Sequence, residues 1–153
     1  MSNSKNKKKA LNIIIVGCGK VGATLIEQLC AEGNDITIID MNADKVQSLS
    51  SAYDVMGVVG NGASFSVQQE AGIDKTDLFI AVTESDELNL LCCTVAKKVG
   101  NCAAIARVRN PDYTKDINYL RNKLGLTFII NPELEASREI ARILYLPTAL
   151  QVN

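Results

Sequence analysis

The sequence of 153 residues contains no histidine and no tryptophan, and only 5% of its residues are aromatic. Without histidine, the side chain that most often serves acid–base catalysis and metal binding is missing. No run of about 18 apolar residues occurs, so no membrane-spanning helix is expected. The formal net charge of −1 gives no overall positive field for nucleic acid. These absences argue against acid–base catalysis, membrane insertion and nucleic-acid binding.

The five cysteines do not form a C-x-x-C pair. Cys92 and Cys93 are adjacent on an expected helix, so their side chains point in different directions. An odd number of unpaired cysteines is typical of free thiols in a reducing compartment, which predicts a cytoplasmic protein. A metal site built only from cysteines and carboxylates is not expected, and we predict no metal ligands.

Strand and helix patterns alternate along the chain. Residues 11–17 form a near-continuous apolar run rich in β-branched residues, which is typical of a buried parallel strand. Such alternation with short connections predicts an α/β fold: a Rossmann-like, doubly wound parallel sheet of six strands with helices on both faces. The expected strands are 11–17, 35–40, 54–59, 77–82, 102–109 and 126–130, and the expected helices are 20–32, 42–51, 64–71, 85–99, 113–124 and 132–146. In the helix over 85–99, the spacing places Leu88, Leu91, Cys92, Val95 and Val99 on one side.

A G-x-G-x-x-G pattern at Gly17, Gly19 and Gly22 follows the first strand and opens the first helix. In that context it predicts a phosphate-binding loop. Gly17 permits a tight turn, Gly19 lets the backbone approach a pyrophosphate, and Gly22 lets helix and strand pack closely. Free N–H groups at the helix start, with Lys20 nearby, would then hold the anion. A tight turn without a ligand is the alternative.

Asp40 ends the second strand, 18 residues after Gly22. A carboxylate there accepts hydrogen bonds from ribose hydroxyls and repels a 2′-phosphate. No Arg or Lys follows among Met41, Asn42 and Ala43. The pattern therefore favours NAD(H) or an adenosine nucleotide over NADP(H). A charge that only supports the start of the next helix is the alternative.

Two further loops follow strands at the same edge of the expected sheet. Gly60-Asn61-Gly62 follows the third strand, and Thr83-Glu84 follows the fourth. Both are placed to contact a nucleotide, although turn and cap chemistry would explain them equally well.

Arg107 and Arg109 are two residues apart in the fifth strand, so both point to one side. Burying an unpaired arginine is costly. We expect one of them to meet a phosphate, Glu84 or Asp86, and a plain structural ion pair is the alternative.

Several enzyme signatures are absent. There is neither a G-x-S-x-G elbow nor a G-x-x-x-x-G-K-[ST] loop. Tyr119 and Lys123 match the spacing of short-chain dehydrogenases, but no catalytic serine precedes them in the expected place. We therefore predict no catalytic residues and no enzyme. The alternative is the cofactor-binding fragment of an NAD-dependent dehydrogenase, and the acidic balance disfavours a redox sensor that contacts DNA.

Three stretches are more specific than the glycine loop: T-E-S-D-E-L-N at 83–89, A-R-V-R-N-P at 106–111 and N-P-E at 131–133. With that loop, they resemble the regulator of potassium conductance (RCK, or KTN) nucleotide-binding domains of the TrkA and KtrA type. The resemblance implies such a domain over residues 11–147, between a flexible basic tail at 1–10 and a C-terminal tail at 148–153. Family members continue into a smaller C-terminal domain, which this sequence does not contain.

The resemblance also implies a function. Such domains bind NAD(H) or ATP/ADP without turnover, form homo-oligomeric dimers or rings, and gate a membrane potassium translocator from the cytoplasmic face of the cell membrane. The last helix, from Pro132, would cross to a partner subunit, with a core face as the alternative for its apolar side. The residues expected to bind the nucleotide are Gly17, Cys18, Gly19, Lys20, Val21, Gly22, Asp40, Met41, Asn61, Thr83, Glu84 and Arg107.

Overall fold

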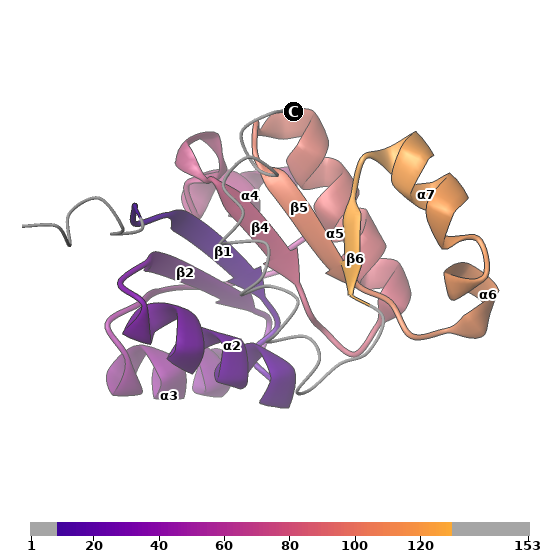
Figure 1. Cartoon of the computed structure of the whole chain (residues 1–153). Coiled ribbons are helices and arrows are strands. Elements are labelled where there is room, and N and C mark those ends of the chain that lie inside the picture. Colours follow the sequence, from indigo (N-terminus) through magenta and orange to yellow (C-terminus); the bar gives the residue numbers. More distant parts are fainter. Residues whose placement is uncertain (1–8, 130–153) are drawn as a thin grey trace, which may run out of the picture.

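The computed structural model describes residues 9–129, which alternate between strands and helices as predicted (Figure 1). The strands are β1 (Asn12–Val16), β2 (Asp35–Asp40), β3 (Met56–Val59), β4 (Leu78–Ala81), β5 (Ala103–Arg107) and β6 (Thr127–Ile129). The helices are α2 (Lys20–Ala31), α3 (Ala43–Ala52), α4 (Phe65–Glu70), the 3₁₀ turn η1 (Ile73–Lys75), α5 (Asp86–Val99), α6 (Pro111–Thr114) and α7 (Ile117–Leu124).

The six strands form one sheet in the order β3-β2-β1-β4-β5-β6, and all five neighbouring pairs are parallel. The chain starts at the centre of the sheet, moves outward to β3, and crosses back to β4 beside β1. In that pairing, Ile13 of β1 lies opposite Ile36 of β2 on one side and Leu78 of β4 on the other. The predicted Rossmann-like, doubly wound α/β fold is confirmed, and the carboxyl ends of β1 and β4 lie side by side.

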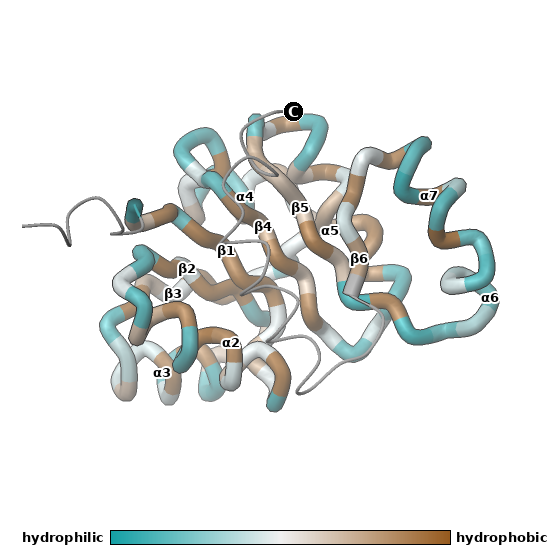
Figure 2. The backbone as a smooth tube through the Cα atoms, viewed as in Figure 1, coloured by the Kyte–Doolittle hydropathy of each residue, from teal (hydrophilic) through white to brown (hydrophobic). Residues whose placement is uncertain are grey.

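Helices cover both faces of the sheet: α2 and α3 lie on one face and α5 on the other (Figure 1). Successive strand residues point to opposite faces. In β1, Ile13 and Ile15 therefore pack toward α2 and α3, while Ile14 and Val16 pack toward α5. Figure 2 shows the result as hydrophobic strands within a more polar outer layer of helices and loops. This double covering explains why the strands read as continuous apolar runs.

Helix ends follow the expected local chemistry. Gly33, with φ 88°, adopts the left-handed conformation that ends α2. The Asn42 side chain caps α3 by accepting hydrogen bonds from the backbone N–H groups of Asp44 and Lys45 at 3.0 and 3.1 Å. Ser85 caps α5 in the same way, accepting from Leu88 N–H at 3.1 Å. These caps stabilise the first turns of α3 and α5, which follow the carboxyl ends of β2 and β4.

The helix expected over 113–124 is wrong in its extent, because the segment forms two helices, α6 and α7. Asn110 caps α6 and Pro111 occupies its first position, so this helix begins earlier than expected. It also ends early, since the Asp116 N–H bonds to the carbonyl of Tyr113, three residues back. The strand expected over 102–109 stops at Arg107. The last expected helix, 132–146, lies outside the described residues, as do residues 1–8 and 148–153 of the expected tails.

The side of α5 that was expected to be apolar is buried only in part. Cys92 is 0% exposed and Leu88 packs against the core, but Leu91 and Val99 are 53% and 38% exposed. Asn89 and Cys93 are also 0% exposed, so small and polar residues of α5 face the sheet, where the small side chains of Ala81, Ala104 and Ala106 let the helix approach closely. Within residues 9–129, no helix has the length and apolar character needed to cross a bilayer.

Candidate functional site

A cavity of about 270 Å³ lies at the carboxyl edge of the sheet, where β1, β2, β4 and β5 end. Ligands of doubly wound domains bind at this edge. Helix α2 begins here with Gly19 as its N-cap and without a side-chain cap. The first N–H groups of α2 therefore lack intrahelical partners and favour an anion. The residues that line the cavity are Gly17, Gly19, Lys20, Val21, Asp40, Lys45, Val82, Thr83, Glu84 and Arg107.

The three glycines of the loop meet three different demands. Gly17 has φ 110°, and a Cβ there would also lie 2.9 Å from Thr83 N, so this position needs a glycine for its turn and for its close approach to the next strand. A Cβ on Gly22 would collide with the carbonyl oxygen of Gly17. A Cβ on Gly19, in contrast, would meet no atom within 4 Å among the described residues beyond its chain neighbours. The backbone at Gly19 is therefore open toward the cavity, as a phosphate-binding turn requires.

Asp40 fastens the glycine loop to the end of β2. Its Oδ2 accepts a hydrogen bond from Cys18 N–H at 2.7 Å, and its Oδ1 accepts one from Asn42 N–H at 2.8 Å. A carboxylate has about four acceptor positions. Asp40, which is half-buried and lines the cavity, therefore keeps capacity for ribose hydroxyls while it holds the loop.

The opposite wall is formed by the loop between β4 and α5 together with Arg107. The Arg107 side chain is 7% exposed, and its Nη1 donates to the Thr83 carbonyl at 3.1 Å. Arg109 is exposed, and its Nη2 donates to the Glu84 carbonyl at 3.2 Å. Both guanidinium groups thus bond to the loop that follows β4, although Arg109 lies beyond the end of β5. Asp86 accepts from the backbone N–H of Arg109 at 2.9 Å.

The lining contains three cations, Lys20, Lys45 and Arg107, and two carboxylates, Asp40 and Glu84. Together with the N-terminus of α2, this balance suits a ligand that carries phosphates and ribose hydroxyls. Cys18 lies beneath the loop and is 6% exposed. Burial, and secondarily the charge of Asp40, raises the pKa of the Cys18 thiol to about 12, so it remains a neutral thiol at neutral pH.

The cavity brings together eight of the twelve residues expected to bind a nucleotide: Gly17, Gly19, Lys20, Val21, Asp40, Thr83, Glu84 and Arg107. Four others lie around it. Cys18 and Gly22 support the loop from within, as described above. Met41 is 71% exposed and does not line the cavity. The Asn61 side chain instead accepts from Ala63 N–H at 2.9 Å, which is the turn chemistry left open by the sequence.

Sequence reasoning missed Lys45, Val82 and Asn89. Lys45 lies in the first turn of α3, just beyond residues 41–43, which contain no cation. Val82 is an apolar residue of the cavity wall, and no sequence motif marks it as a site residue. Asn89 does not line the cavity but is a fully buried polar residue in an amphipathic helix, and a polar residue at a helix position that faces the core is the signal that could have revealed it.

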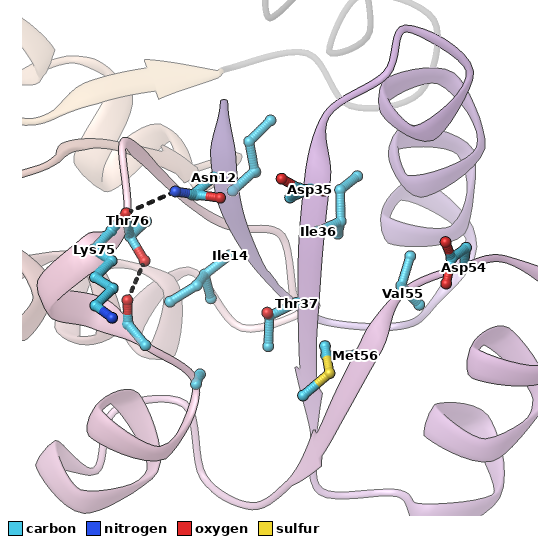
Figure 3. Close-up of a pocket in the computed structure, with 13 residues that line it drawn as sticks. Asn12, Ile14, Asp35, Ile36, Thr37, Asp54, Val55, Met56, Lys75 and Thr76 are labelled. Carbon is cyan, nitrogen blue, oxygen red and sulfur yellow. Dashed lines mark hydrogen bonds between the residues drawn. The ribbon is translucent and has the colours of Figure 1, made fainter. Parts of the chain in front are cut away.

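A second, larger hollow of about 410 Å³ lies over the amino halves of β1, β2 and β3 (Figure 3). Figure 3 shows Ile14, Thr37 and Met56, which come from these three neighbouring strands, beside the turn that carries Lys75 and Thr76. Neither the glycine loop nor Asp40 reaches this hollow. Since ligands of doubly wound sheets bind at the carboxyl edge, we assign the candidate site to the smaller cavity. Within residues 9–129, no group of three or more Cys, Asp or Glu side chains is arranged to hold a metal ion.

The strand order and the glycine loop at the end of β1 define a Rossmann-type domain of the doubly wound class. Comparison with known proteins gives the family: the chain belongs to the TrkA-N domain family, whose model matches residues 13–132.

Curated relatives include the Trk system potassium uptake protein TrkA of Vibrio alginolyticus, which is 39% identical over 145 residues that span 93% of this chain and 32% of the relative. The chain spans about a third of the length of this relative, and of the TrkA protein of Haemophilus influenzae and the TrkA homolog of Archaeoglobus fulgidus that it also matches.

Solved structures share the fold at lower identity. The TrkA-N domain of the inner membrane protein ybaL from Escherichia coli superposes with a TM-score of 0.70 at 23% identity, covering 89% of this chain and 95% of that one. The GsuK channel bound to NAD gives a TM-score of 0.66 at 20% identity, covering 79% and 21%. GsuK bound to ADP also gives 0.66 at 20% identity, covering 80% and 31%.

Proposed function

We propose that this domain binds NAD(H) or ATP/ADP at the carboxyl edge of its sheet and thereby regulates a membrane potassium transporter or channel. The observation that carries the proposal is the Asp40 carboxylate, which joins the glycine loop to β2 and lines a cavity whose far wall holds Arg107. An adenosine ribose would lie at Asp40, and its phosphates would lie at Gly19 and the start of α2. We take residues 11–147 as this domain, between the tails at 1–10 and 148–153.

The link to potassium transport rests on the relatives. The proteins that match over 93% of this chain are named as potassium uptake proteins, and GsuK has been described as a channel bound to NAD and as bound to ADP. We infer that this chain acts in the cytoplasm, at the inner face of the membrane, through contact with a potassium translocator subunit. Leu91 and Val99, which are exposed on α5, offer apolar surface for a second copy in a homo-oligomer.

We propose a regulatory role without catalysis. The cavity lining holds two carboxylates, three cations and the Thr83 hydroxyl, and among the described residues it contains no histidine, cysteine or serine side chain. A cofactor-binding fragment of a dehydrogenase is less well supported, since the named relatives are potassium uptake proteins. Steady oxidation of NADH over a panel of substrates would favour the dehydrogenase.

Regulation by a nucleotide requires two conformations with different affinities for it. The terminal phosphate of ATP and the second nucleoside of NAD extend beyond the first ribose in different ways. They would therefore make different contacts with Lys20, Glu84 and Arg107, which line the cavity. In this mechanism, exchanging one nucleotide for the other changes the relative stability of two gating states.

Isothermal titration calorimetry of NADH, NAD, ATP and ADP against the purified chain tests the binding proposal. We expect saturable binding of at least one of the four, weakened about tenfold or more by Asp40→Ala, because a hydrogen bond to a charged group is worth about 1.5–3 kcal/mol. Asp35→Ala is the matched control, since Asp35 begins the same strand and lines the hollow at the other edge of the sheet.

Two results would contradict the proposal. One is that none of the four nucleotides binds the folded chain. The other is that Asp35→Ala weakens binding as much as Asp40→Ala, which would place the ligand elsewhere. Because Asp40 also braces the loop, the melting temperature of each variant must be measured beside its affinity.

A further inference from the structure

Asn89 lies one turn inside α5 and is 0% exposed. Its Oδ1 accepts hydrogen bonds from Thr83 N–H at 2.9 Å and from Thr83 Oγ1 at 2.7 Å. Its Nδ2 donates to the carbonyl oxygens of Thr83 at 3.1 Å and of Arg107 at 2.9 Å. A side-chain amide has two donor hydrogens and two acceptor positions, so this one amide group is fully used.

These four bonds connect two residues of the cavity wall. Thr83 follows β4 and Arg107 ends β5, and both line the cavity. The Arg107 guanidinium also joins the two residues directly, because its Nη1 donates a hydrogen bond to the Thr83 carbonyl at 3.1 Å. The backbone of Arg107 and the backbone and hydroxyl of Thr83 are thus fixed to the same side chain of α5.

The network also determines what Thr83 can offer a ligand. A hydroxyl has one hydrogen to donate. The shortest bond of Thr83 Oγ1 is the one to Asn89, and the same oxygen accepts from Ser85 N–H at 3.2 Å. The hydroxyl hydrogen is therefore used within the protein, by Asn89 or by the Ser85 carbonyl at 3.3 Å, and one acceptor position of the oxygen remains. Thr83 contributes to the cavity as a positioned wall residue beside Glu84 and Arg107.

Packing alone does not call for an amide at this position. Its neighbours on the buried face of α5 are Asp86, Cys92, Cys93 and Ala96, and an apolar residue in its place would leave the Thr83 N–H and the Arg107 carbonyl without this partner. A fully satisfied buried polar group instead specifies one geometry. The same end of α5 also holds the chain that leaves β5, because Asp86 Oδ2 accepts from the N–H groups of Arg109 at 2.9 Å and Asn110 at 2.7 Å.

We propose that Asn89 is a positioning residue for the nucleotide site, holding the wall of Thr83, Glu84 and Arg107 at the distance from Asp40 that a ligand longer than a nucleoside monophosphate needs. This inference rests on the proposed function. Asp40 and the glycine loop are fastened by other bonds, so they stay in place when Asn89 is removed. Loss of Asn89 therefore weakens long ligands selectively and leaves the affinity for AMP nearly unchanged.

The test compares AMP, ADP and NADH on the wild-type chain, Asn89→Ala, Arg107→Ala and the double variant. We expect Asn89→Ala to weaken ADP and NADH about tenfold and AMP less than about twofold, which corresponds to losing one charge-assisted contact. Since Asn89 acts through Arg107, the two substitutions should not add: the double variant should bind ADP and NADH about as weakly as Arg107→Ala alone.

Asn34→Ala is the matched control. Asn34 is 7% exposed, and its amide also joins two chain segments, accepting from Leu11 N–H at 3.0 Å and donating to the Leu29 carbonyl at 3.1 Å. It lies at the turn before β2, at the opposite edge of the sheet from the cavity. It should lower the melting temperature without changing the ratio of ADP to AMP affinity.

Three outcomes would overturn the inference: equal weakening of AMP and NADH, full additivity with Arg107→Ala, or the same change of selectivity in Asn34→Ala. A wild-type chain that binds none of these nucleotides would instead overturn the proposed function, and this inference with it. If Asn89→Ala does not fold, Asn89→Ser serves in its place, because its shorter, uncharged side chain cannot span both Thr83 and Arg107.

Discussion

A different physical reason accounts for the glycine at each of three positions in the loop between β1 and α2. Gly17 needs a positive φ, Gly22 needs the absence of a Cβ beside the Gly17 carbonyl, and Gly19 has free space around it. The first two requirements come from the fold itself. The contacts of residues 9–129 do not explain the third, and a ligand that approaches the backbone at Gly19 would explain it.

This difference predicts opposite outcomes for two substitutions. Gly19→Ala should leave the melting temperature nearly unchanged and weaken nucleotide binding, since its methyl group projects where the ligand would lie. Gly22→Ala should lower the free energy of unfolding by about 1–3 kcal/mol or more through overpacking, although Gly→Ala inside a helix normally stabilises by about 1 kcal/mol. Thermal unfolding and calorimetric titration of both variants check this. Strong destabilisation by Gly19→Ala would contradict it.

How far the sequence predicts the site depends on the residue. The glycines and Asp40 follow from a motif whose spacing is fixed by the turn and by the ribose. Lys45 and Val82 were not predictable in this way, because no motif marks them. They line the cavity only because the fold brings the start of α3 and the end of β4 to it. Asn61 was ambiguous from sequence, since an asparagine after a strand caps a turn as readily as it contacts a ligand.

Between elements, α5 is joined to α6 by a hydrogen bond from Tyr113 to Glu87. The Tyr113 hydroxyl donates to Glu87 Oε2 at 2.7 Å. This bond lowers the pKa of Glu87, because it favours the ionised carboxylate, and it raises the pKa of Tyr113, because it favours the neutral phenol.

The contribution of this bond to stability should therefore depend on pH at both ends. A lowered carboxylate pKa gives stability that is present above the ordinary glutamate pKa and is lost as pH falls through the lowered value. A raised phenol pKa gives stability that is present below the ordinary tyrosine pKa and is lost as pH rises through the raised value. The difference in unfolding free energy between wild type and Tyr113→Phe should be largest near neutral pH and shrink in acid and in strong base.

Urea unfolding from acid to alkaline pH measures that difference. Tyr119→Phe is the control, since Tyr119 lies on α7 and is 64% exposed. A difference for Tyr113→Phe that stays constant across this range, or one that Tyr119→Phe reproduces, would refute the role of the Glu87 bond.

The elements themselves were largely predictable from hydrophobic patterns. Continuous β-branched runs mark β1 and β2 because both of their faces are buried. The pattern was only partly right at α5, where Cys92 of the expected side is fully buried but Leu91 and Val99 of the same side are exposed. It could not separate α6 from α7 either, because the break depends on the cap at Asn110 and on a three-residue turn at Asp116.

In the whole molecule, the cysteines are distributed over both core layers. Cys18 belongs to the core beneath α2 and α3, and Cys92, Cys93 and Cys102 belong to the core beneath α5. Burial raises the pKa of every one of these thiols, to about 12 for Cys18 and Cys92. Cys30 is half-buried, and partial burial also raises its pKa.

Thiol labelling should therefore report the intact fold. At neutral pH we expect a disulfide reagent such as Ellman's to modify at most Cys30 at a measurable rate, because the thiolate is the reactive form and the other thiols are both buried and neutral. All five cysteines should react in urea. Cys30→Ser should abolish the labelling of the folded chain, and rapid reaction of two or more thiols in the wild type would show that one core layer opens readily.

The strand order divides the sheet at the β1–β4 pair, with β1, β2 and β3 on one side and β4, β5 and β6 on the other. The cavity lies over this seam: Asp40 and the glycine loop come from the first half, and Thr83, Glu84 and Arg107 come from the second. A bound nucleotide would thus act as a noncovalent cross-link between two halves that already share the β1–β4 strand pair and both core layers. Any excursion that separates the halves must first release the ligand, so its occupancy suppresses that opening in proportion to its concentration.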